Sequence, residues 1–179
     1  MNALKRFVHR LEDPSPSLIR SLRDNNIRPE VMMCYYYNNT CLIALDKRWH
    51  VWTFPQGGID EGENARVALE RETKEELGNT FFKHIKHPQK YEMIGHGHIP
   101  IIPNPMHKDP DKRNLIGKHF FIYAVIMESP CNVIKSDELA GFRWETYHDM
   151  LKYIRTVKSN QKRKLLMKVL DIMQNKGYI

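Results

Sequence analysis

The chain lacks several features that would have restricted its class. None of its 179 residues falls within an apolar run of about 18 residues, the length needed to cross a bilayer. Only three cysteines occur, Cys34, Cys41 and Cys131, and no two have the CxxC spacing. Neither a disulfide framework nor a structural zinc site is therefore expected. We predict a protein of the reducing cytoplasm with no membrane segment.

Acidic residues are missing from one stretch near the C-terminus. Residues 151–170 hold seven lysines and arginines and no acid, whereas the rest of the chain has 21 basic and 21 acidic residues. The whole net charge of +7 therefore lies in this stretch. Such clustering suits a polyanionic partner, but a helix face exposed to solvent would give the same charge pattern. If the partner is RNA, the expected phosphate contacts are Lys158, Lys162, Arg163 and Lys164.

We predict a helical extension at residues 1–26 and one domain at residues 27–179. Apolar residues in the first eleven positions repeat at helical spacing until Pro14 and Pro16 interrupt them. Acidic residues soon afterwards disfavour a transit peptide, so a packing or partner helix is expected.

The domain alternates β-forming segments with turn signals. Strands are predicted at 31–37, 40–45, 50–54, 90–94, 118–127 and 142–145. Helices are predicted at 64–77, 147–157 and 159–176, and a surface loop at 99–114. Asn38-Asn39 reads as a hairpin turn between the first two strands. This order predicts an α+β fold, arranged as an α/β/α sandwich.

Three carboxylates gather within one turn of the helix predicted at 64–77. Glu72, Glu75 and Glu76 have the i, i+3, i+4 spacing that places side chains on one face. They repel one another and crowd the C-terminal half, where the helix dipole disfavours negative charge. Hard oxygen ligands in such a cluster suit Mg²⁺ or Mn²⁺. An acidic face alone is usually only solvated, but this one follows a strand and a glycine loop.

Here the sequence resembles the Nudix hydrolase family. The charged and glycine positions of that family's signature are matched by Gly57, Glu63, Arg71, Glu72, Glu75, Glu76 and Gly78. Thr73 and Asn79 stand where the family prefers apolar residues. Seven spaced matches make the motif specific, and the resemblance implies a mixed central sheet with C-terminal helices.

Further motifs narrow the resemblance to bacterial RNA pyrophosphohydrolases and diadenosine-polyphosphate hydrolases. They span roughly residues 27–178. They are Arg28-Pro29-x-Val31, Trp52-x-Phe54-Pro55-Gln56-Gly57-Gly58, Gly117-Lys118-x-Phe120-Phe121 and Glu138-x-x-Gly141-Phe142-Arg143-Trp144. The implied activity is metal-dependent cleavage of the 5′ triphosphate end of RNA. The alternatives are hydrolysis of diadenosine polyphosphates or other small nucleotides, or an inactive module that binds nucleotides or RNA.

The resemblance also implies roles for the acidic segment. Glu72, Glu75 and Glu76 are the expected metal ligands, helped by a main-chain carbonyl at Gln56 or Gly57. Glu72 or Glu75 is expected to take the proton of the attacking water. The structural members of the motif are expected to be Glu63, Arg71 and Gly78.

Substrate contacts are expected at Arg28, Lys47 and Lys158. Val157 stands where relatives carry a base-stacking phenylalanine, which weakens the case for base recognition. Many relatives have a further catalytic glutamate at a position that falls near Cys131-Asn132 here. Glu128 and Glu138 are the two acids that could replace it. The oligomeric state is not predictable from these residues.

Overall fold

The computed structural model describes residues 11–88, 91–131 and 138–179. Its helices are α1 (Pro16–Asp24), α2 (Ala65–Leu77), α3 (Asn79–Lys83), η2 (Pro110–Lys112), α4 (Tyr147–Arg155) and α5 (Asn160–Asn175). Its strands are β1 (Ile27–Tyr37), β2 (Thr40–Asp46), β3 (Val51–Thr53), β4 (Gln56–Gly58), β5 (Glu92–Pro100), β6 (Gly117–Ile126) and β7 (Leu139–Glu145).

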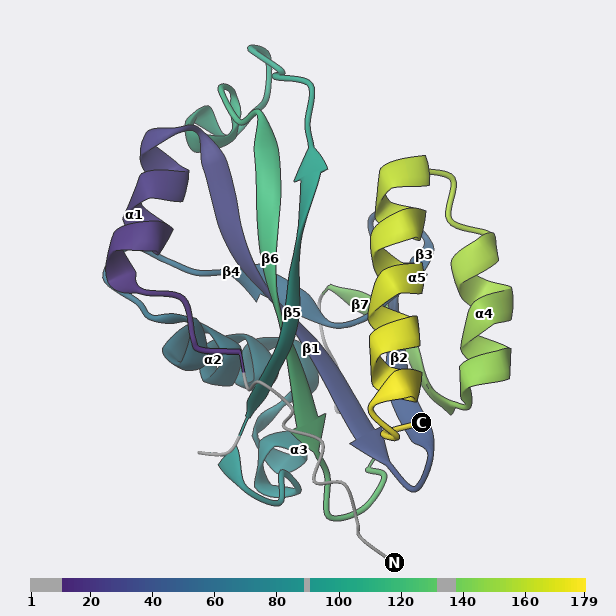
Figure 1. Cartoon of the computed structure of the whole chain (residues 1–179). Helices are drawn as coiled ribbons and strands as arrows, with labels where there is room; N and C mark the ends of the chain where they lie inside the picture. The colour runs from purple at the N-terminus through teal and green to yellow at the C-terminus, as the bar shows by residue number, and fades with distance from the viewer. Residues whose placement is uncertain (1–10, 89–90, 132–137) are drawn as a thin grey trace, which may run out of the picture.

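One mixed sheet runs through the molecule. Its order is β3-β2-β1-β6-β5, with β4 also paired to β1 and β7 to β2. Strands β1 and β6 are parallel, and the other pairs are antiparallel. The turn between β1 and β2 has positive φ at both Asn38 and Asn39, the conformation of a tight hairpin. Figure 1 shows α1, α2 and α3 on one side of the sheet and α4 and α5 on the other.

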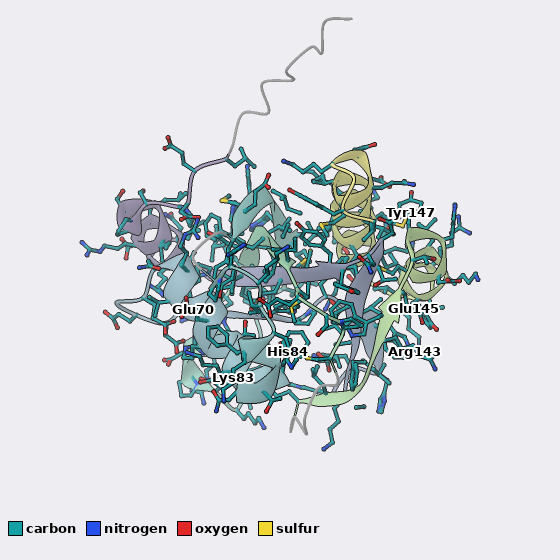
Figure 2. All side chains as sticks on the ribbon, turned by 90° about the horizontal axis from the view of Figure 1, so that it is seen from below. Glu70, Lys83, His84, Arg143, Glu145 and Tyr147 are labelled. Carbon is teal, nitrogen blue, oxygen red and sulfur yellow. The ribbon has the colours of Figure 1, made fainter. Side chains whose placement is uncertain are left out.

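Two apolar cores result, because successive side chains of β1 point to opposite faces. Val31 and Met33 pack with Leu69 of α2, whereas Met32 and Cys34 belong to the core that holds α4 and α5. In Figure 2, Glu70 of α2 and Tyr147 of α4 accordingly lie on opposite sides of the molecule. The α/β/α sandwich predicted from the sequence is confirmed.

Several predicted boundaries differ from the structure. The strand predicted at 90–94 continues through residue 100, into the first residues of the loop predicted at 99–114, because glycines at 95 and 97 let α5 lie directly on it. A short helix, α3, which was not predicted from the sequence, begins straight after Gly78. The described part of the N-terminal extension, α1, packs on the domain through the buried Ile19. None of the helices in the described ranges is long and apolar enough to span a membrane.

Candidate metal-dependent active site

Strand β4 and helix α2 bring the glycine loop and the acidic residues together. Gly57 of β4 lies opposite Val31 of β1, near the middle of the sheet. A β-carbon at Gly57 would overlap the carboxylate of Glu72. A larger residue at this position would therefore displace the Glu72 carboxylate from the loop. The helix starts at Asn64, whose side chain accepts hydrogen bonds from two N–H groups of the first turn.

Arg71 contacts three glutamates of the motif, Glu63, Glu72 and Glu75. Its guanidinium donates to both oxygens of Glu63, each at 2.9 Å, and to the main-chain oxygen of Gly58 at 2.8 Å. It also donates to Glu72 at 2.8 Å and to Glu75 at 2.9 Å. A guanidinium has about five N–H donors, so these contacts use its whole capacity. This arrangement leaves Arg71 no spare donor for a substrate phosphate.

Glu76 is buried in an unfavourable environment. Its residue is 5% exposed, and one carboxylate oxygen finds no hydrogen-bond partner among the described residues. Burial raises its pKa well above the ordinary value, and the charges of Glu72 and Glu138 raise it further. A hydrogen bond from the main chain of Gln56 opposes that shift. The side-chain oxygen of Gln56 is likewise buried without a partner in the described part of the chain.

Glu138 lies near the acidic cluster. Burial raises the pKa of Glu72, Arg71 opposes the shift, and the charges of Glu75 and Glu138 add to it. Glu138 also adjoins the β2–β3 turn, because its main-chain oxygen accepts from the Lys47 N–H at 2.8 Å. Of the two acids considered as replacements for the downstream glutamate, Glu138 therefore has its charge at the site. Asn132, next to the expected position, lies outside the described residues.

The three expected ligands are not arranged around a common centre. Glu75 has a side chain 58% exposed and turned to Arg71, whereas Glu76 is buried. No three carboxylate, imidazole or thiol groups of the described residues are placed to hold one ion. The partnerless oxygens of Glu76 and Gln56 nevertheless fit a hard cation. Such an ion would give those oxygens a partner and would offset the repulsion between the acids.

Basic side chains lie beside the acids, on the face of the sheet that carries α5. Arg28 of β1 pairs in register with Lys118 of β6. Both contact the buried Glu30, from Lys118 at 2.6 Å and from Arg28 at 3.5 Å. A β-carbon at Gly58 would meet the guanidinium of Arg28, so this cation lies against the glycine loop. The buried acid fixes two cations at the edge of the candidate site.

The other two predicted substrate residues lie on the surface. Lys47 is exposed in the β2–β3 turn, and Lys158 is exposed between α4 and α5. Val157 is buried in the core beneath those helices. It therefore offers no stacking surface to a base.

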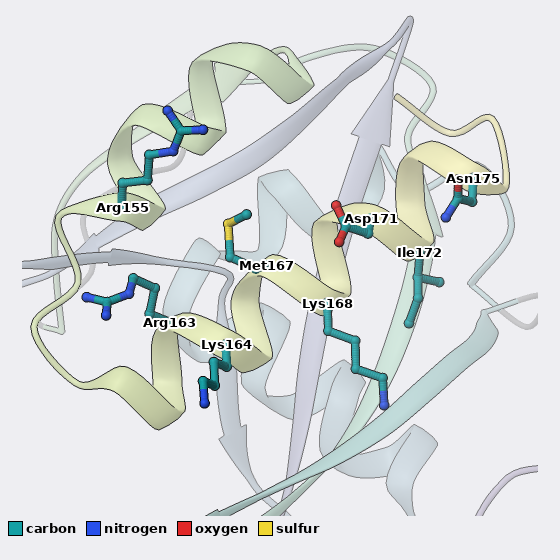
Figure 3. Close-up of a pocket in the computed structure, with 8 residues that line it drawn as sticks. All are labelled: Arg155, Arg163, Lys164, Met167, Lys168, Asp171, Ile172 and Asn175. Carbon is teal, nitrogen blue, oxygen red and sulfur yellow. The ribbon is translucent and has the colours of Figure 1, made fainter.

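The basic segment, continuous in the sequence, divides between two surfaces in the structure. Lys162 is directed inward, toward Lys118, Asp46, Glu30 and Glu76, whose charges act on it. The outer side of α5 and the end of α4 form a groove of about 500 Å³ (Figure 3). Its basic lining residues are Arg155, Arg163, Lys164 and Lys168.

Not all four of those cations are available to a ligand. Arg163 donates to the main-chain oxygen of Val157 at 2.9 Å and to Asn160 at 3.2 Å, so it ties α5 to the preceding connection. Arg155, Lys164 and Lys168 have no ion pair within the described ranges. These three cations are therefore the ones that the groove can offer to an anion.

Comparisons with known proteins identify relatives of this chain in sequence and in structure. A family model described as NUDIX domain matches residues 27–168. The chain is 29% identical over 164 residues to a protein named RNA pyrophosphohydrolase from Campylobacter jejuni subsp. doylei, covering 87% of this chain and 98% of that protein. Escherichia coli dihydroneopterin triphosphate pyrophosphohydrolase superposes with a TM-score of 0.60 at 15% identity, over 83% of this chain and 95% of that one. The Caenorhabditis elegans Ap4A hydrolase gives 0.60 at 18% identity, over 84% and 97%.

Proposed function

Since this chain belongs to the Nudix family of hydrolases that act on acid anhydrides, we propose that it cuts the 5′ triphosphate end of RNA to a monophosphate, using Mg²⁺ or Mn²⁺. The observation that carries the proposal is the buried carboxylate of Glu76, which lies beside Glu72 and has one oxygen without a partner among the described residues. Next to it lies a basic strip of the sheet, formed by Arg28 and Lys118. The acidic side chains, which a metal ion would stabilise, thus lie next to basic side chains that can bind an anion. A metal-bound oligophosphate supplies both the cation and the anion. The cytoplasm, where RNA 5′ ends are found, is the proposed place of action.

The acidic residues have distinct parts in this chemistry. Glu72, Glu75 and Glu76 would hold the metal, together with a main-chain carbonyl of Gln56 or Gly57. The bound ion would neutralise phosphate oxygens and lower the pKa of a water. Water oxygen would bond to phosphorus and a phosphoanhydride bond would break, so that pyrophosphate leaves in one step or two phosphates leave in succession.

The proton of that water goes to a carboxylate near the reaction. Glu72 or Glu75 was the expectation from the sequence, and Glu138 is a third candidate because its charge acts on the same cluster. Arg28 would contact the substrate phosphates, and Lys47 and Lys158 would extend that contact outward. Glu63, Arg71 and Gly78 would hold the loop and helix in position.

RNA is favoured over a small nucleotide by the basic groove on α5. A polymer offers phosphates beyond the reactive ones, and each cation that meets one adds affinity. A relative that aligns with 87% of this chain is named an RNA pyrophosphohydrolase. The buried Val157 offers no ring on which an RNA base could stack, which weakens the case for RNA. Diadenosine polyphosphates, the alternative given by the sequence, are therefore the second candidate.

A substrate panel separates these functions. Triphosphorylated RNA, a diadenosine polyphosphate and nucleoside triphosphates are incubated with Mg²⁺, with Mn²⁺ or with EDTA, and the released phosphate and pyrophosphate are measured. The proposal predicts that kcat/KM is highest for RNA and that EDTA removes the activity. A higher value for the dinucleotide selects the second candidate. No turnover of any substrate would leave a binding module.

A further inference from the structure

Helix α5 buries one stripe of side chains, and Lys162 extends that stripe by one turn. Leu165 and Leu166 are buried three and four residues after it, the spacing at which helical side chains share a face. Arg163 points elsewhere, to the main-chain oxygen of Val157. The direction of Lys162 toward the sheet therefore follows from the helical register.

Two glycines of β5 determine where α5 lies on the sheet. A β-carbon at Gly97 would overlap Leu165, and one at Gly95 would lie 3.3 Å from Ile172. Residues later in the helix thus lie against residues earlier in the strand. Helix α5 runs antiparallel to β5, and its first turn lies beyond Gly97, toward the C-terminal end of that strand.

That end of the sheet is where the basic strip lies. Ile99 of β5 pairs with Lys118 of β6, which in turn pairs with Arg28 of β1. Phe120 belongs to the core under α5, and alternation along β6 puts Lys118 on the same face. The first turn of α5 therefore brings Lys162 over Lys118, on the face that borders the glycine loop.

Unlike Lys118 and Arg28, which both contact Glu30, Lys162 has no ion-pair partner among the described residues. Lys118 is bonded to Glu30 at 2.6 Å. Within the described residues, no carboxylate forms an ion pair with Lys162. Burial, followed by the positive charge of Lys118, lowers the pKa of Lys162, while Asp46, Glu30 and Glu76 act in the opposite direction. A half-buried ammonium between these groups is costly unless an anion reaches it.

We propose that Lys162, with Lys118 beside it, forms a phosphate subsite on the α5 side of the active site. Its ammonium group donates to a non-bridging oxygen of a phosphate in the substrate's oligophosphate chain, away from the acidic cluster. The proposal rests on the proposed function only in requiring an oligophosphate substrate, whether RNA or a dinucleotide carries it. Lys162 is a binding residue here, and α5 becomes one wall of the site.

The test compares Lys162→Met with Lys152→Met. Methionine keeps the apolar stem of either lysine and removes the charge. Lys152 is exposed on α4 and pairs with Asp149 at 2.6 Å, away from the site. Two quantities are measured: the Kd of inorganic tripolyphosphate by calorimetry with Mg²⁺, and KM for RNA and for a diadenosine polyphosphate. Circular dichroism gives the folded fraction of each variant.

Lys162→Met should weaken tripolyphosphate binding and raise both KM values by about 10- to 100-fold, the cost of one charge-assisted hydrogen bond. Lys162→Arg should recover most of that loss, and Lys152→Met should change little. Unchanged tripolyphosphate binding in Lys162→Met would overturn the subsite. An equal loss of binding in Lys152→Met, or a fall in the folded fraction large enough to explain the loss, would overturn it too. Because tripolyphosphate is not RNA, this outcome stays separate from the substrate question. A protein that cleaves only dinucleotides overturns the RNA proposal and leaves this subsite in place.

Discussion

Arg71 and Glu63 are joined by two parallel hydrogen bonds of 2.9 Å each, from Nε and Nη2 of the guanidinium to the two carboxylate oxygens. This bidentate geometry is one that lysine cannot reproduce. It links the loop before α2 to the middle of that helix. The same guanidinium also holds the main-chain oxygen of Gly58 in place.

We expect Arg71→Ala to lower both the melting temperature and the activity. The change leaves several carboxylates close together without their shared cation. Charge-assisted hydrogen bonds contribute about 1.5–3 kcal/mol each, and the partial exposure of Arg71 reduces the expected total to a few kcal/mol. Thermal unfolding in EDTA measures the first effect and kcat/KM the second. An unchanged melting temperature with only a raised KM would assign Arg71 to substrate binding instead.

Glu76→Gln should abolish turnover while making the metal-free protein more stable. Glutamine keeps the shape but removes a buried negative charge and a hard anionic ligand. The pKa of Glu76 is raised by folding, so its contribution to stability is present below its ordinary pKa and is lost as pH rises through the raised value. Metal-free wild-type protein should therefore lose stability between acidic and neutral pH, and Glu76→Gln should lose less. Wild-type-like turnover in this variant would remove Glu76 from the ligand set.

Removal of the metal should silence the enzyme and lower its melting temperature. An ion that binds only the folded state stabilises it by about 2.7 kcal/mol at a concentration of 100 Kd. We expect Mg²⁺ or Mn²⁺ to restore both quantities in wild type after EDTA treatment. Neither ion should stabilise Glu75→Gln or Glu76→Gln to the same extent. Equal stabilisation of all three proteins would locate the ion elsewhere.

Glu138→Gln should lower kcat with little change in KM. Its charge acts on Glu72 and Glu76, which makes it the described acid best placed to replace the downstream glutamate. Loss of a general base typically costs about 100-fold or more. Glu128→Gln is the matched control, because Glu128 is the other acid that was considered as a replacement and is not named among the charges that raise the pKa of Glu72 or Glu76. If the two variants behave alike, Glu138 has no part in the proton transfer.

The sequence predicted the acidic helix and its loop because local spacing determines them. Glu72, Glu75 and Glu76 follow from helical periodicity, and Gly57 from the turn that precedes it. Lys162 could not be assigned a direction in the same way. Its neighbours Arg163 and Lys164 are equally basic, and only the contact of α5 with β5 decides which of the three faces the site.

Glu30 and the length of β5 were missed for related reasons. Glu30 is an isolated acid in a strand, and its role appears only when Lys118 is placed beside it by parallel pairing with β6. The two glycines that extend β5 weaken a strand prediction, yet they are what lets α5 pack there. Both features depend on contacts between residues far apart in the sequence, which a short stretch of sequence does not reveal.

We expect the outer groove of α5 to serve RNA and not small nucleotides. The informative variant replaces Arg155, Lys164 and Lys168 by alanine, and it spares Arg163, which ties α5 to its neighbour, and the inward-facing Lys162. Loss of three phosphate contacts should reduce the slope of log K against log salt by about 2 on single-stranded RNA. Exposed residues in the groove contribute little to stability, so the variant should stay folded.

The most direct test of RNA as the substrate is kcat/KM for triphosphorylated RNA and for a diadenosine polyphosphate, measured at low and moderate salt with wild type and this triple variant. We predict that wild type prefers RNA, that its preference falls as salt rises, and that the triple variant loses activity on RNA alone. Two results would contradict the assignment of RNA 5′ ends as the substrate. One is a triple variant as active as wild type on RNA at both salt concentrations. The other is a wild type that prefers the dinucleotide.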